Sequence, residues 1–227
     1  MAALEDLSHY QTWLLDLDGT LVDSAPDLHG ALEATLTRHD HPTVSEALVR
    51  QFVGAGARVL IERALAELYP QLDTQQAALA NIDVLHAHFL DYYAGHIADR
   101  SKPYPGVRET LITLGERGVA LAVVTNKYEG LSRQLLHALD LSEYFGAVVG
   151  GDTLPVRKPD PGPLLEACRQ LGSDPTRTVM IGDSITDVRA ARNADMPVIC
   201  VSYGYNHGED ICSAGADRVV DSLQSLI

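Results

Sequence analysis

The chain is poor in cysteine and in positive charge, and each shortage excludes a class of protein. Its three cysteines, Cys168, Cys200 and Cys212, show no CxxC spacing, so we expect neither a disulfide framework nor a zinc site. Such cysteine usage is typical of a protein in a reducing compartment. Lysine and arginine together number 17, against 31 aspartate and glutamate residues. The resulting net charge of −14 argues against nucleic acid as a partner, because a nucleic-acid groove needs a basic stripe.

Long apolar runs are missing as well. No apolar segment approaches the ~20 residues that a membrane helix needs, so we expect no membrane partner. The first ten residues include Glu5 and Asp6 and lack the basic start of a secretory signal. With 46% hydrophobic residues among 227, the chain is long enough for a substantial core. These features predict a globular, cytoplasmic protein, without indicating its oligomeric state.

A short strand and then a long helical stretch occupy the first part of the chain. The apolar run Trp13–Leu15 ends in acidic and glycine residues, as a buried strand does where it meets a turn. From about residue 26 to 97, the composition and the spacing of apolar residues predict several amphipathic helices and no strands. The four-residue spacing is clearest at Leu28, Leu32 and Leu36.

After residue 106 strands and helices alternate. The expected strands are 119–124, 147–149, 178–181, 198–201 and 218–220, and the expected helices are 131–139, 163–171 and 185–194. Such alternation predicts a Rossmann-like parallel sheet with helices on both faces and a ligand site at the carboxyl ends of the strands. We therefore expect an α/β core, residues 1–22 and 102–227, with an all-helical cap domain, residues 23–101, inserted after the first strand.

Two carboxylates follow the first strand. On extended backbone the side chains of Asp16 and Asp18 point the same way, so one can attack phosphorus while the other handles the proton of the leaving group. Their mutual repulsion needs relief, which a magnesium ion bridging to phosphate supplies. A plain acidic turn is the alternative for this motif alone. An EF-hand is excluded, because its glycine and glutamate positions hold Leu21 and Asp27.

A second acidic pair, Asp183 and Asp187, lies four residues apart at the start of a predicted helix. Both side chains share one face of that helix, directly after the strand 178–181, so we expect Asp183 to face Asp16 across the sheet. The alternative is that these acids only favour the helix dipole. Two acidic clusters that both fall at strand ends favour a functional site.

Two further segments supply groups for a phosphate. Thr125 and Asn126 follow a predicted strand, where a hydroxyl and backbone amides can hold phosphate oxygens, although Thr-Asn is also an ordinary turn. Lys158 precedes a predicted helix, where its ammonium can bind phosphate, although a lone lysine is more often a surface charge. The sequence contains no P-loop, HExxH or GxSxG motif.

The order of these motifs, DxDGT, Thr-Asn, Lys and GDxxxD, resembles that of the haloacid dehalogenase-like superfamily of phosphatases. The resemblance covers nearly the whole chain, including the helical insertion. It implies that Asp16 is the nucleophile and forms an aspartyl-phosphate, and that Asp18 acts first as general acid and then as general base. It also implies that Thr125 and Lys158 bind the phosphoryl group.

The same resemblance implies magnesium as the cofactor. Its ligands would be Asp16, the backbone carbonyl of Asp18, and Asp183, with Asp187 as a supporting acid. Members of the superfamily that cleave carbon–halogen bonds lack the second aspartate of the first motif. The presence of Asp18 therefore indicates a phosphoryl-transfer member, whose partner is a small anionic phosphorylated metabolite.

A narrower similarity is to phosphoglycolate phosphatases, and it departs from their pattern at Leu15, where a phenylalanine is common. It is carried by residues 16–28, 53–57, 158–161 and 203–206. The similarity implies hydrolysis of 2-phosphoglycolate to glycolate and phosphate. Phosphatases of sugar phosphates, nucleotides or pyrophosphate have similar segments, and a hexose-phosphate mutase or a non-catalytic phospho-ligand binding module also stays open. Arg58, in the cap, is a candidate to bind the substrate carboxylate, or else an ordinary surface arginine.

Overall fold

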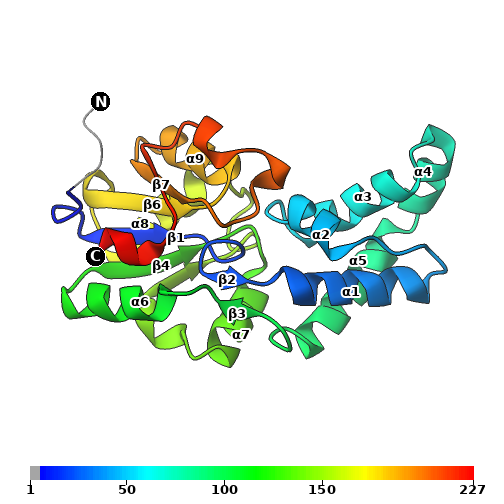
Figure 1. Cartoon of the computed structure of the whole chain (residues 1–227), viewed down its shortest axis with the longest axis horizontal. Helices are drawn as coiled ribbons and strands as arrows, with labels where there is room; N and C mark the ends of the chain where they lie inside the picture. Colours follow the sequence, from blue (N-terminus) through cyan, green and yellow to red (C-terminus); the bar gives the residue numbers. More distant parts are fainter. Residues whose placement is uncertain (1–5) are drawn as a thin grey trace.

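The computed structural model describes residues 6–227, which surround a six-stranded sheet (Figure 1). The strand order is β5-β4-β1-β6-β7-β8, and every neighbouring pair is parallel. The strands are β1 (Thr12–Leu15), β4 (Ala120–Val124), β5 (Ala147–Val149), β6 (Thr178–Gly182), β7 (Val198–Val201) and β8 (Arg218–Val220). The predicted Rossmann-like parallel sheet is confirmed, with the first strand at its centre.

Successive side chains of each strand enter two different apolar layers, one on each face of the sheet. Leu15 and Ile181 belong to one layer, whereas Leu14 and Met180 belong to the other. Helices α6 (Val107–Glu116) and α7 (Glu129–Ala138) pack into the first layer, and helices α8 (Gly162–Leu171) and α9 (Ile185–Asn193) into the second. The sheet is therefore covered on both faces, as the alternating pattern predicts.

Five helices lie together to one side of the sheet, on the right in Figure 1. They are α1 (Ala25–Arg38), α2 (Glu46–Phe52), α3 (Ala57–Leu68), α4 (Leu72–Leu79) and α5 (Ile82–Gly95). The four-residue repeat Leu28, Leu32 and Leu36 is the buried face of α1, which packs chiefly against α5. The prediction of several amphipathic helices between residues 26 and 97 is confirmed.

A small antiparallel ribbon joins the helical part to the sheet. Its two strands are β2 (Val22–Asp23) and β3 (Lys102–Pro103), with Val22 paired to Pro103 and Asp23 to Lys102. The chain leaves the sheet region along β2 and returns along β3 (Figure 1). We propose that this ribbon is the boundary between core and cap, because its strands lie at the two predicted ends of the inserted cap domain, residues 23–101.

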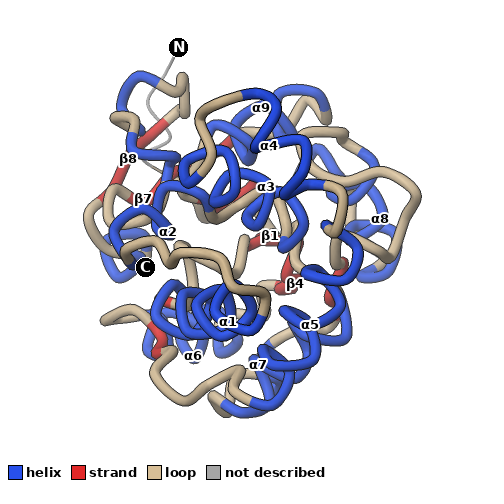
Figure 2. The backbone as a smooth tube through the Cα atoms, turned by 90° about the vertical axis from the view of Figure 1, so that its right-hand side faces the viewer, coloured by secondary structure: helices blue, strands red, loops and turns tan. Residues whose placement is uncertain are grey.

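The remaining elements are short 3₁₀ helices: Ser142–Tyr144, Pro175–Arg177, Asn206–Gly208, Ile211–Ser213 and Leu223–Leu226. Figure 2 views the molecule from the side of the five helices, and the strands β1 and β4 appear behind α1, α3 and α5. Between residues 6 and 227, no helix has the length and the apolar character that crossing a membrane requires.

Candidate active site

A cavity of about 90 Å³ lies where the carboxyl ends of β1 and β4 meet the five helices. Its polar side comes from the loops after these two strands: Asp16, Asp18, Thr125, Asn126 and Lys127. Its apolar side comes mainly from α3 and α5, among them Leu60, Phe89 and Leu90. Reactive groups of the core are thus covered by apolar groups of the helical part, in the place that the strand pattern predicts.

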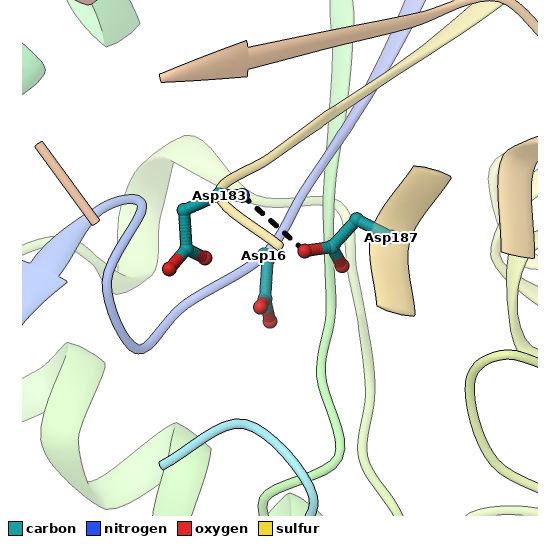
Figure 3. A group of neighbouring side chains, drawn as sticks. All are labelled: Asp16, Asp183 and Asp187. Atoms are coloured by element: carbon teal, nitrogen blue, oxygen red, sulfur yellow. Dashed lines mark hydrogen bonds between the residues drawn. The ribbon is translucent and has the colours of Figure 1, made fainter. Parts of the chain in front are cut away.

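Three buried aspartates form a cluster beside this cavity (Figure 3). Asp16 follows β1, Asp183 follows β6, and Asp187 lies in the first turn of α9. One carboxylate oxygen from each lies within 4.8 Å of the others. The predicted approach of Asp183 to Asp16 is therefore present in the structure, because β1 and β6 are hydrogen-bonded neighbours whose carboxyl ends meet.

Among the described residues, one ammonium pairs with this cluster. The Nζ atom of Lys158 lies 2.7 Å from Oδ1 of Asp187 and 3.0 Å from Oδ1 of Asp16, and it also donates a hydrogen bond to the carbonyl of Val124. Only 1% of the Lys158 side chain is exposed, so it is not the surface lysine of the alternative interpretation. Burial lowers the pKa of Lys158, but Asp16 and Asp187 outweigh burial and raise it above its ordinary value. Lys158 is therefore charged.

Asp187 uses its two oxygens for different tasks. Oδ1 accepts the hydrogen bond from Lys158, whereas Oδ2 accepts from the backbone N–H groups of Asp183 and Ser184 and from the Ser184 hydroxyl. With Ser184 it forms a capping box at the start of α9. Asp187 thereby orients both Lys158 and the loop that carries Asp183, which is the geometry of a supporting acid.

Asp183 is held between two close-packed turns. Its Oδ1 accepts from the Thr20 hydroxyl at 3.0 Å, and its Oδ2 accepts from the backbone N–H of Tyr205 at 2.6 Å. Gly19 has a φ of +88°, and a Cβ atom there would lie 2.3 Å from Oδ2 of Asp183. Glycine is therefore required at position 19 both by the left-handed backbone and by the space that Asp183 occupies.

The cluster carries more negative charge than its one ammonium balances. Burial raises the pKa of Asp16 to about 7, against the opposing effect of Lys158 and with a further contribution from Asp187. Burial and the neighbouring Asp187 and Asp16 also raise the pKa of Asp183 well above its ordinary value. Crowded carboxylate oxygens with unbalanced charge are the donor set that a hard divalent cation prefers, so this cluster can bind a metal ion.

Asp18 lies outside this cluster and has a different partner. Both of its oxygens accept hydrogen bonds from Nζ of Lys127, at 2.9 and 3.1 Å, and Oδ1 also accepts from the Ser24 hydroxyl. Lys127 is buried and lines the cavity, yet our sequence analysis did not single it out. The available signal was its position directly after Thr125 and Asn126, at the end of β4.

Thr125 and Asn126, both predicted to bind phosphate, line the same cavity as Asp16. The Thr125 oxygen accepts a hydrogen bond from the backbone N–H of Lys127, which leaves the hydroxyl proton able to point to a ligand. The Asn126 side chain instead donates to the carbonyls of Gly54 and Lys158. It therefore connects the loop before α3 to the segment that carries Lys158.

Arg58 lies at the rim of the cavity. Its guanidinium forms ion pairs with Asp83, at 2.5 Å, and with Glu62, at 3.3 Å, and 43% of its side chain is exposed. The structure thus brings Arg58 to the predicted cavity but leaves its charge paired with cap acids. Its contact with a substrate stays a prediction.

Comparisons with known proteins agree with this geometry. Residues 13–201 match the family described as haloacid dehalogenase-like hydrolases. The chain is 45% identical over 213 residues to a phosphoglycolate phosphatase of Nitrosococcus oceani, covering 92% of each protein. It is also 45% identical to a phosphoglycolate phosphatase of Caulobacter vibrioides, covering 98% of this chain and 91% of the relative.

A solved structure shows the same fold. The crystal structure of a predicted phosphoglycolate phosphatase from Haemophilus somnus superposes with a TM-score of 0.86 at 32% identity, covering 96% of each chain. The chain belongs to the haloacid dehalogenase-like hydrolases.

Proposed function

We propose that this hydrolase is a magnesium-dependent phosphomonoesterase that converts 2-phosphoglycolate to glycolate and phosphate through an aspartyl-phosphate. The observation that carries the proposal is the convergence of Asp183 and Lys158 on Asp16, which lines a cavity together with Asp18. The substrate is supported by the relatives named above, which are phosphoglycolate phosphatases at 45% identity over most of both chains.

Asp16, Asp183 and the backbone carbonyl of Asp18 are the groups proposed to hold magnesium. The residues fit the ion, because Asp16 and Asp183 are buried oxygen donors whose charge Lys158 alone does not balance. When bound, magnesium would neutralise the charge on the phosphoryl oxygens. Asp187 would stay a supporting acid, since its Oδ1 accepts from the Lys158 ammonium and its Oδ2 already accepts three hydrogen bonds.

Asp16 is the proposed nucleophile. Its Oδ1 is held by the backbone N–H of Leu17 at 2.8 Å and by Lys158 at 3.0 Å, which leaves Oδ2 to attack phosphorus in line with the leaving oxygen. Lys158 would offset the charge that gathers on the phosphoryl oxygens during attack. The Thr125 hydroxyl would donate to one of these oxygens, and Asn126 would fix the loop around them.

Asp18 is the proposed general acid and base. It lines the same cavity as Asp16, so it can reach the ester oxygen of a phosphomonoester bound there. It would donate a proton to the departing alkoxide and then accept one from the water that attacks the aspartyl-phosphate. Ser24 and Lys127 fix the direction of its carboxylate in both steps.

The apolar side of the cavity limits the size of the leaving group that a bound phosphomonoester can carry. A cavity of about 90 Å³ with an apolar wall is small, which favours a leaving group of the size of glycolate over a nucleoside. Side chains such as Phe89 and Leu60 would keep bulk water away from the bound phosphate. Asp16 rather than a water molecule would then attack phosphorus first.

The proposal is tested by phosphate release from 2-phosphoglycolate, with and without magnesium, beside sugar phosphates, nucleoside monophosphates and pyrophosphate. We expect magnesium-dependent release with the highest kcat/KM on 2-phosphoglycolate. A higher kcat/KM on another compound would refute 2-phosphoglycolate as the substrate but would still support magnesium-dependent phosphate hydrolysis. Isomerised sugar phosphate without free phosphate would identify a mutase and refute hydrolysis.

A further inference from the structure

Lys127 is a buried cation on the side of the cavity where the leaving group departs. Only 6% of its side chain is exposed, and its Nζ lies 2.9 Å from the proposed acid Asp18. The same Nζ lies 4.6 Å above the ring of Tyr93, a cation–π arrangement that ties a loop of the core to helix α5. The ion pair with Asp18 and the contact with the Tyr93 ring fix the ammonium at this place.

Tyr93 brings a hydroxyl whose proton has no acceptor among the described residues. Its side chain lines the cavity, and its buried oxygen interacts with the Lys127 ammonium, which can only donate. Burial raises the pKa of Tyr93 to about 12, against a smaller opposing effect of the nearby ammonium, so the hydroxyl keeps its proton and can donate it. A buried unpaired donor is costly, and its position beside a buried ammonium indicates an anionic ligand atom at this place.

We propose that Lys127 and Tyr93 form the subsite that binds the carboxylate of the leaving group. The ligand class is a phosphomonoester with a carboxylate on the carbon that carries the ester oxygen. The inference rests on the proposed function and deepens it, because it assigns substrate selection to these two residues.

The covalent geometry of such a substrate fits the positions of the groups. Asp18 must come within about 3 Å of the ester oxygen to protonate it. In a phosphate ester of glycolate the carboxylate carbon is two bonds from that oxygen, so its oxygens lie about 3–4 Å away. Nζ of Lys127 is 2.9 Å from Asp18, so one bound pose lets Asp18 meet the ester oxygen while Lys127 meets the carboxylate.

Arg58 and Arg157 are further cations that line the cavity in the described part of the chain. Arg157 is exposed, and the Arg58 guanidinium is paired with Asp83 and Glu62 at the partly exposed rim, so water screens both charges. Lys127 lies deeper, where a charge-assisted hydrogen bond is stronger and where a ligand without the carboxylate leaves Tyr93 unpaired. The site therefore discriminates by chemistry as well as by size.

The test compares Lys127→Met, Tyr93→Phe and Arg58→Met on two matched substrates, 2-phosphoglycolate and ethyl phosphate, which has a methyl group in place of the carboxylate. For each protein the readout is the ratio of the two kcat/KM values, because a general loss of folding or of Asp18 orientation lowers both. We expect Lys127→Met to lower the ratio about tenfold to a hundredfold, and Tyr93→Phe about tenfold. Arg58→Met is expected to leave the ratio unchanged.

A ratio that stays at the wild-type value in both Lys127→Met and Tyr93→Phe would overturn the inference. A selective loss in Arg58→Met alone would overturn it too and assign the carboxylate to the rim. Tyr93→Phe keeps the test decisive if Lys127→Met fails to fold, because it removes one hydroxyl and keeps the ring that contacts the Lys127 ammonium. The wild-type protein tests the proposed function separately: activity on ethyl phosphate with none on 2-phosphoglycolate would refute the substrate itself.

Discussion

Lys158 and Asp16 form an ion pair with 3.0 Å between Nζ and Oδ1, and both side chains are almost completely buried. Lys158 is also 2.7 Å from Asp187, so one ammonium serves two carboxylates while Asp183 lies alongside. Stability and chemistry are therefore coupled in this cluster. The charge imbalance that favours a metal ion also destabilises the protein without the metal.

Removing the ammonium should destabilise the metal-free protein strongly. In Lys158→Met the buried carboxylates of Asp16 and Asp187 lose the ammonium that pairs with both, so we expect the free energy of unfolding at pH 8 to fall by about 3–5 kcal/mol. Lys102→Met is the matched control, since Lys102 is exposed and its loss should change stability by less than about 0.5 kcal/mol. Urea unfolding in a chelator measures both variants. Equal changes would show that the cluster does not depend on Lys158.

Stability without metal should fall as the pH rises toward neutrality. The pKa of Asp16 is raised from 3.8 to about 7 in the folded protein, so the folded state holds this proton more tightly than the unfolded state. The resulting stabilisation is complete below about pH 4 and is lost as the pH passes 7. Asp183, whose pKa is also raised, acts in the same direction.

The measurement is the melting temperature of wild type minus that of Asp16→Asn, in a chelator, from pH 4.5 to 8. We expect this difference to decrease with pH, because asparagine mimics the protonated acid at every pH. Added magnesium should raise the wild-type melting temperature more at pH 8 than at pH 5.5, since it competes with the proton. A difference that increases with pH would contradict the assignment.

A methyl group at position 19 should damage the metal site. Gly19→Ala combines the strain of a positive φ with a contact of 2.3 Å to Oδ2 of Asp183, whereas Gly118→Ala has a φ of +72° and open space. Both variants should lose about 1–2 kcal/mol from backbone strain. Only Gly19→Ala should also weaken magnesium binding, by more than about tenfold, because Asp183 must move. Titration calorimetry with magnesium compares the two variants, and equal affinities would exclude Asp183 as a ligand.

Most of the sheet could be predicted because its strands are buried on both faces and flanked by turns. Strands β5, β7 and β8 begin and end at the predicted residues, and β4 and β6 differ by one. Helix α6 was missed although Val107, Leu111 and Leu114 are buried at helical spacing. The ribbon β2–β3 has two residues in each strand, too few for a periodic pattern to form.

The site was predicted as far as strand order determines it. Asp16 and Asp183 meet because parallel strands end at one edge, and a sequence pattern can show that. The partnership of Lys127 with Asp18 and Tyr93 could not be predicted in this way, since it depends on where α5 packs over the core. Asn126 lines the cavity, but its amide connects two backbone segments, a contact that spacing alone does not reveal, and its binding of phosphate stays a prediction.

The central claim is that Asp16 carries the phosphoryl group, and acid-quenched mass spectrometry of Asp18→Asn tests it most directly. This variant keeps the nucleophile but lacks both the acid of the first step and the base that activates water. Acetyl phosphate, whose acetate leaves without a proton, should therefore still form the intermediate in the presence of magnesium and let it accumulate. We expect one phosphoryl group (HPO₃) on the peptide that contains Asp16, and none in the double variant that also carries Asp16→Asn. A phosphoryl group on another residue, or turnover at the wild-type rate by Asp16→Asn alone, would contradict the account.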